Sequence, residues 1–136
     1  MIKPIISAHC RTDIQTEIQS LIEQLNASSV PVIVEGKKDK RALESLGVST
    51  WLTVNKPLFQ IVESLTQKEV AILTDLDKEG KALYGKLQQE CLRRGIKINN
   101  RLRHFLLRET PLATMEGLPH YLRSQCAIPS RGTLPF

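Results

Sequence analysis

Residues 30–39 read VPVIVEGKKD, and residues 70–80 read VAILTDLDKEG. Each stretch begins with a short run of β-branched and other apolar residues and ends in carboxylates. Apolar runs of this kind are typical of strands buried on both faces, as in parallel sheets. The first run ends at Glu35, and the second is followed by Asp75 and Asp77. The two stretches therefore predict buried strands with acidic residues at their carboxyl ends.

The spacing of apolar residues around these stretches predicts further helices and strands in alternation. Helices are expected near residues 12–25, 37–46, 58–65, 79–94, 102–106 and 114–123. Strands are expected at residues 30–34, 48–54, 70–73 and 96–98. Strands and helices that alternate in this way form right-handed βαβ units. We therefore predict an α/β fold with a small, mostly parallel, four-stranded sheet and helices on both faces.

The length of 136 residues favours a single domain. Within it we expect an N-terminal amphipathic helix in residues 1–29 that packs on the domain, a core over residues 30–109, and a C-terminal helix and tail over residues 110–136. No apolar run approaches the roughly 18–20 residues of a membrane span, so no membrane partner is expected. The three cysteines contain no Cys-x-x-Cys pair, which disfavours a disulfide framework or zinc ribbon and favours a cytoplasmic protein.

The carboxylates at the two strand ends carry the predicted chemistry. Parallel strands all point the same way, so both strand ends open on one edge of the sheet, where ligands of α/β sheets bind. If the two strands are neighbours, their backbones lie about 5 Å apart. Three carboxylates this close repel one another unless a cation lies among them. Oxygen ligands without a nearby His or Cys favour a hard cation, so we predict Glu35, Asp75 and Asp77 as ligands of Mg²⁺.

Helix capping is the alternative role for such carboxylates. Acidic residues at strand-to-helix junctions often serve as N-caps or as favourable first-turn charges. Asp39 and Glu79 fit that role, and Asp77 is compatible with it. Glu35 fits it poorly, because it stands between an apolar residue and a glycine.

The order Val-Glu-Gly-Lys-x-Asp, followed about forty residues later by an apolar strand and Asp-x-Asp-x-x-Gly, resembles the Toprim domain. That domain is shared by type IA and type II topoisomerases, bacterial-type primases, recombination-repair proteins and some small nucleases. The length and spacing are most similar to small stand-alone Toprim proteins, best known from archaea. The resemblance covers residues 30–98 and extends more weakly to residue 118.

The resemblance implies roles for individual residues. It makes Glu35 a metal ligand or a general acid/base, and Asp75 and Asp77 the metal-holding pair, with Asp75 bridging two Mg²⁺ ions per subunit. It also implies that Lys37 contacts phosphate, so Glu35 and Lys37 are the expected catalytic residues. The remaining matched positions are structural: Gly36, Asp39 and Gly80.

The charge distribution favours a polyanionic partner. The formal net charge is +5, and residues 78–108 contain nine Lys or Arg but only two Glu. A local basic excess beside an acidic site is typical of proteins that bind nucleic acid. The predicted nucleic-acid contacts are Lys37, Lys78, Lys81, Arg93, Arg94 and Arg101.

Three functions remain open from the sequence. The first is Mg²⁺-dependent phosphoryl transfer on nucleic acid, as a nuclease, and the second is a non-catalytic Mg²⁺-dependent module that binds nucleic acid or ribonucleoprotein. The scarcity of aromatic residues, 4% of the chain, disfavours single-strand binding by stacking and slightly favours structured RNA over DNA. The third, a small-molecule phosphatase or nucleotide-binding protein, is supported only by the general fold shape. The sequence leaves the oligomeric state open.

Overall fold

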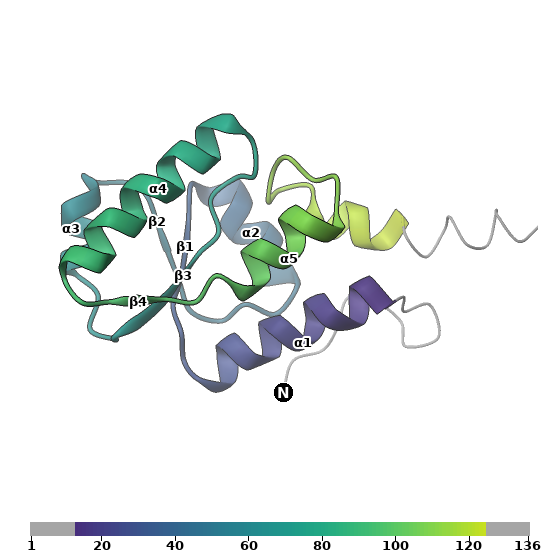
Figure 1. Ribbon diagram of the computed structural model, residues 1–136. Coiled ribbons are helices and arrows are strands. Elements are labelled where there is room, and N and C mark those ends of the chain that lie inside the picture. Colours follow the sequence, from purple (N-terminus) through teal and green to yellow (C-terminus); the bar gives the residue numbers. More distant parts are fainter. Residues whose placement is uncertain (1–12, 125–136) are drawn as a thin grey trace, which may run out of the picture.

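The computed structural model describes residues 13–124 of the chain. Its elements are α1 (Asp13–Ala27), β1 (Val32–Val34), α2 (Lys37–Ser45), β2 (Trp51–Thr53), α3 (Leu58–Glu63), β3 (Glu69–Ile72), α4 (Lys78–Arg93), β4 (Lys97–Ile98) and α5 (Arg101–Glu109). Another helix begins at Leu118 and continues to the last described residue (Figure 1). Residue 12 of the first predicted helix, two of the cysteines (Cys10 and Cys126) and the tail after residue 124 lie outside the described residues.

The sheet has the strand order β2-β1-β3-β4, and every neighbouring pair is parallel. The predicted α/β architecture with a four-stranded sheet is therefore confirmed. Strands β1 and β3 lie side by side at the centre, with Val32 opposite Ala71. The chain runs from β1 through α2 to the outer strand β2, and from β3 through α4 to the outer strand β4 at the opposite end of the strand order. The direction in which strands are added therefore reverses between β1 and β3. This reversal is the switch point at which ligands of open α/β sheets bind.

Alternation along the strands divides the apolar residues between two cores. In β1, Val32 and Val34 face one side of the sheet and Ile33 faces the other. The first side is covered by α1, α2, α5 and the segment 115–122, and the second by α3 and α4 (Figure 1). Helices thus cover both faces, as predicted. Within residues 13–124, no helix combines the length and the apolar character needed to cross a membrane.

Strands β1 and β2 begin later than predicted because the residues before them close the preceding helices, whereas β3 keeps its predicted length of four residues and is shifted by one. The N–H of Val30 donates to the carbonyl of Leu25 at 2.9 Å, and the N–H of Val48 donates to the carbonyl of Leu43 at 3.0 Å. Apolar periodicity does not distinguish a residue that closes a helix from the first residue of a strand. Pro31, between Val30 and the start of β1, has no N–H and so cannot donate a hydrogen bond within the sheet.

The last predicted helix, residues 114–123, begins later than expected, at residue 118. The reason lies in the contacts of the segment before it. The N–H of Leu76 donates to the carbonyl of Ala113 at 2.8 Å, and the N–H of Met115 donates to a carboxylate oxygen of Asp75 at 2.9 Å. Residues 113–115 thus bend against the end of β3 and are not helical.

A close approach of backbone to backbone fixes the junction between β3 and α4. Asp77 is the N-cap of α4, and its Oδ1 accepts the N–H of Gly80 at 2.8 Å. The hydroxyl of Thr74 donates to the carbonyl of Gly80 at 2.7 Å. A Cβ at Gly80 would overlap the carbonyl group of Asp75, so only glycine allows α4 to start this close to the strand end.

We expect Gly80→Ala to lower the free energy of unfolding by about 3 kcal/mol, because the added methyl must push backbone away. The matched control is Gly85→Ala in the same helix, where a Cβ meets nothing within 4 Å. This control should raise stability by about 0.5–1 kcal/mol through helix propensity. Urea unfolding of both variants measures the difference, and equal stabilities would contradict the close approach.

Candidate functional site

The structure brings Glu35 and Asp75 together at the switch point. Glu35 directly follows β1, and Asp75 lies three residues beyond the end of β3. The backbone N–H of Asp75 donates to Oε2 of Glu35 at 2.7 Å. Glu35 is free to make this contact because the N-cap position of α2 falls to Gly36, and no side chain caps that helix. Both acidic residues are half-buried.

Each of these carboxylates uses one oxygen to accept a backbone N–H. Oε2 of Glu35 accepts from Asp75, and Oδ1 of Asp75 accepts from Met115. No hydrogen bond from the described residues reaches the second oxygen of either group. The backbone therefore fixes both carboxylates and leaves one oxygen of each for another ligand.

Asp77, the third predicted ligand, has a structural contact. It is exposed, and its Oδ1 caps α4 through the N–H of Gly80. The capping role considered for Asp77 is therefore present. Its predicted part in binding metal stays a prediction.

Asp39 joins the acidic group, although its sequence position indicates only a structural role. It is buried in the first turn of α2, and its pKa is raised to about 6. Burial is the largest cause, followed by the negative charges of Asp75 and Glu35, with a smaller effect of Glu116. The sequence contains a signal for this placement, because Asp39 lies one helical turn before the buried Leu43.

Arg103 is the functional-site residue that sequence spacing does not reveal. It falls in the basic stretch 78–108, yet the residue is only 2% exposed. Its guanidinium donates to the carbonyl of Thr74 at 2.6 Å and to the carbonyl of Asp75 at 3.0 Å. It also lies over the ring of Tyr84, with its central carbon 4.5 Å from the ring centre. Arg103 lies between Leu102 and Leu106, which are both buried, and this is the one sequence signal that its side chain points into the protein.

The donor set of the site fits a hard divalent cation. Glu35 and Asp75 offer carboxylate oxygens, and the pKa of the neighbouring Asp39 is raised first by burial and then by the negative charges of these two groups. Within residues 13–124, no three His, Cys, Asp or Glu side chains form a ready-made metal-binding group. A site with two well-fixed carboxylates still suits Mg²⁺, which keeps several waters and uses one or two protein carboxylates.

Three of the predicted nucleic-acid contacts surround this edge of the sheet. Lys37 is the first residue of α2, Lys78 is the first residue of α4, and Lys81 is one turn further. All three are exposed. Helix α2 adds basic residues that the prediction does not include, namely Lys38, Lys40 and Arg41, and the Nζ of Lys40 lies 3.5 Å from the ring centre of Trp51.

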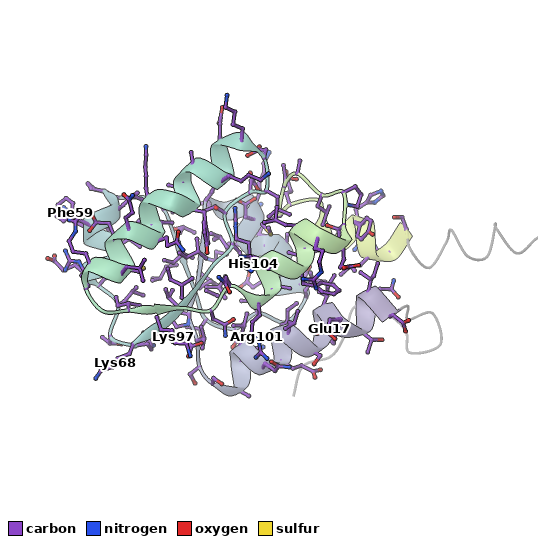
Figure 2. The ribbon with its side chains drawn as sticks, in the orientation of Figure 1. Glu17, Phe59, Lys68, Lys97, Arg101 and His104 are labelled. Atoms are coloured by element: carbon purple, nitrogen blue, oxygen red, sulfur yellow. The ribbon has the colours of Figure 1, made fainter. Side chains whose placement is uncertain are left out.

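The other predicted contacts lie elsewhere. Arg93 and Arg94 are at the opposite end of α4, about 22 Å from Lys78 at 1.5 Å per residue. Arg93 pairs with Glu90 at 3.3 Å, and Arg94 is 4.0 Å from a carboxylate on α3. Arg101 begins α5 beside α1, where it donates to a glutamine of that helix at 2.9 Å (Figure 2). The fold thus divides the basic stretch into separate surfaces.

The raised pKa of Asp39 makes the stability of the metal-free protein depend on pH. As pH rises from 3.8 towards 6, the unfolded chain releases this proton while the folded protein retains it, so stability falls across that window. We expect Asp39→Asn to lack this loss, which is at most about 3 kcal/mol at about 1.4 kcal/mol per pKa unit. Thermal melting from pH 3.5 to 8 should show the variant gaining on the wild type as pH rises.

The exposed Glu44 of the same helix provides the control for this titration. Glu44→Gln should melt in parallel with the wild type at every pH. Parallel curves for Asp39→Asn as well would show that the pKa of Asp39 is not raised in the folded protein.

A solved structure of a protein from Aquifex aeolicus shares this fold. It superposes with a TM-score of 0.68, over 74% of this chain and 94% of that chain, at 23% sequence identity. At this level of identity the likeness shows the fold alone. No protein-family model matches the chain.

Curated archaeal proteins are more similar in sequence. The UPF0292 protein of Methanocaldococcus jannaschii is 36% identical over 118 residues, which cover 80% of this chain and 92% of the relative. The UPF0292 protein of Methanosarcina barkeri is 32% identical over 114 residues, 78% of each chain. That of Thermoplasma volcanium is 31% identical over 97 residues, 68% of this chain and 82% of the relative. The chain belongs to the UPF0292 family.

Proposed function

We propose that this protein is a Mg²⁺-dependent phosphoryl-transfer enzyme of the cytoplasm, a nuclease with a Toprim-type acidic site. The observation that carries the proposal is the meeting of Glu35 and Asp75 at the switch point of a parallel sheet, where the carboxylate of Glu35 accepts the backbone N–H of Asp75 at 2.7 Å. Both carboxylates are held by backbone N–H groups, so their positions are fixed before a substrate binds.

The chain's own residues take complementary roles. Bound Mg²⁺ would neutralise a phosphodiester and offset the charge that develops in the transition state. Glu35 has one oxygen anchored by the backbone of Asp75, and the other oxygen moves a proton as general acid or base. Lys37, exposed at the start of α2, binds a phosphate oxygen close to Glu35.

The surface around the site suits structured RNA. Exposed lysines at the starts of α2 and α4 border the acidic pair on both sides of the switch point. Both helices are oriented with their N-termini towards this edge, which favours an anion there. Phe59, the large aromatic residue that is clearly exposed in the described part of the chain, lies on α3, which follows the outer strand β2 and not either of the two central strands. Binding that depends on phosphate charge rather than base stacking favours a folded or duplex RNA.

A non-catalytic Mg²⁺-dependent binding module is the second candidate. The observation that favours it is the set of exposed lysines at the starts of α2 and α4, which would bind phosphate without any catalytic group. A module of this kind needs the basic surface but not a general acid or base.

Replacing Glu35 with Gln distinguishes the two candidates. In the enzyme, Glu35→Gln should lower the rate of RNA cleavage at least about 100-fold, which is typical for loss of a general acid or base, with affinity for RNA changed little. Labelled RNA and DNA, single- and double-stranded, would be incubated with Mg²⁺ and the wild type or the variant. Glu44→Gln, an exposed glutamate of α2, serves as control and should cleave normally. Binding by the wild type without any cleavage would establish the module instead.

Two double variants of helix α4 locate the nucleic-acid surface. Lys78→Gln with Lys81→Gln removes two charges next to the site, and Arg93→Gln with Arg94→Gln removes two at the far end of the helix. The first pair should reduce the slope of log affinity against log salt by about two, since each lost phosphate contact changes it by about 0.9. The second pair should leave the slope unchanged. Equal effects of both pairs in fluorescence anisotropy would argue against a surface centred on the acidic site.

A further inference from the structure

One peptide group at the site lies between two opposite charges. The carbonyl oxygen of Thr74 accepts a hydrogen bond from the guanidinium of Arg103 at 2.6 Å. The N–H of Asp75, in the same peptide group, donates to the carboxylate of Glu35 at 2.7 Å. In a trans peptide the C=O and the N–H point in opposite directions, so the cation and the anion lie on opposite sides of one amide.

This arrangement strengthens both hydrogen bonds. A guanidinium on the carbonyl and a carboxylate on the N–H polarise the amide in the same sense, and hydrogen bonds in such a chain reinforce one another. Hydrogen bonds to ionised groups are also shorter and roughly twice as strong as neutral ones. The two distances, 2.6 and 2.7 Å, are at the short end of the usual range.

Arg103 also fixes the next peptide group. Its second nitrogen donates to the carbonyl of Asp75 at 3.0 Å, so one guanidinium holds two consecutive carbonyl oxygens. The Cα of Asp75 lies between these two carbonyls, and its side chain is held by the N–H of Met115 at 2.9 Å. The direction of the Asp75 carboxylate is thus set by the backbone on both sides of it.

Packing alone is a poor explanation for a charged residue in this place. Arg103 is 2% exposed, and none of the salt bridges within residues 13–124 includes it. An apolar side chain of similar size would fill the space without the desolvation penalty of a buried cation. Burial lowers the pKa of Arg103, whereas Tyr84, Glu35 and Asp75 act in the opposite direction. The pKa of Arg103 is lowered overall, so Tyr84 and the two carboxylates of the site offset only part of the effect of burial.

We propose that Arg103 is a positioning residue of the acidic site, one that holds the Thr74–Asp75 peptide group and so fixes the carboxylates of Glu35 and Asp75 relative to each other for Mg²⁺, a role that rests on the proposed function. Arg103 itself touches neither metal nor substrate. Its forked guanidinium suits this task, because two donors on a rigid plane reach two carbonyls at once, which a lysine ammonium cannot do with the same geometry.

The test uses the full chain labelled with ¹⁵N, as the wild type and as Arg103→Met, Arg103→Lys and Tyr84→Phe. Two quantities are measured by NMR: the chemical shift of the Asp75 amide proton without metal, and the dissociation constant for Mg²⁺ from a titration. Tyr84→Phe is the matched control, because it keeps the ring under the guanidinium and removes only a buried hydroxyl that has no hydrogen-bond partner.

In the wild type, the Asp75 amide proton should resonate far downfield, because its acceptor is a carboxylate. Arg103→Met should move it upfield and weaken Mg²⁺ binding at least about tenfold, as typical for loss of a residue that orients a metal ligand. Arg103→Lys should give intermediate values for both quantities, and Tyr84→Phe should match the wild type. If Arg103→Met does not fold, Arg103→Lys carries the comparison with the same two readouts.

Arg103 would have a purely structural role if folded Arg103→Met, or folded Arg103→Lys in its place, kept the wild-type Asp75 shift and bound Mg²⁺ within about twofold of the wild type. The failure of the proposed function gives a different pattern. In that case the wild type itself shows no response to Mg²⁺ at Glu35 and Asp75, which overturns the metal site and the part of Arg103 in it. The Asp75 shift in the metal-free variants still decides whether Arg103 orients this peptide group.

Discussion

The structure depends on the hydrogen bonds that fix two carboxylates, those of Glu35 and Asp75, where β1 and β3 end. Glu35 and Asp75 converge there because the two central strands are parallel neighbours and end on the same edge. Two carboxylates in half-buried positions need compensation, and the protein provides it with backbone N–H groups and with the buried Arg103. The pKa of the neighbouring Asp39 is raised to about 6, mainly by burial and further by the negative charges of Asp75 and Glu35.

Most of the unusual features of the fold serve this junction. Gly80 lets α4 begin against the carbonyl of Asp75, and Thr74 and Asp77 hold the first turn of that helix in place. The segment 113–115 stays outside the last helix because its backbone binds Asp75 and Leu76. Arg103 of α5 donates to the carbonyl of Thr74 at the same strand end. Together with Glu35 after β1, four separate parts of the chain thus meet at the end of one central strand. The basic residues that border it come from the starts of α2 and α4.

Much of the fold could be predicted because strands and helices of this type have local signals. The buried apolar runs around Ile33 and Ala71 predicted the two central strands. The alternation of strands and helices along the chain predicted a parallel sheet with both faces covered. The ends of the strands were less predictable, because Val30 and Val48 look like strand residues and yet close helices. The basic stretch 78–108 was predictable only as a count of charges, since its division between surfaces follows from the direction and length of α4.

The sequence by itself determined the α/β class, the two central strands, and the placement of Glu35 and Asp75 at one edge of the sheet, because periodicity and strand direction are properties of short segments. Only the tertiary structure decided the roles of Arg103, Asp39 and the segment 113–115. Arg103 and Met115 reach Asp75 across 28 and 40 residues of sequence, so no local pattern encodes these contacts. Whether a charged side chain faces solvent or a buried peptide group depends on which elements pack around it, and that is fixed only when the chain has folded.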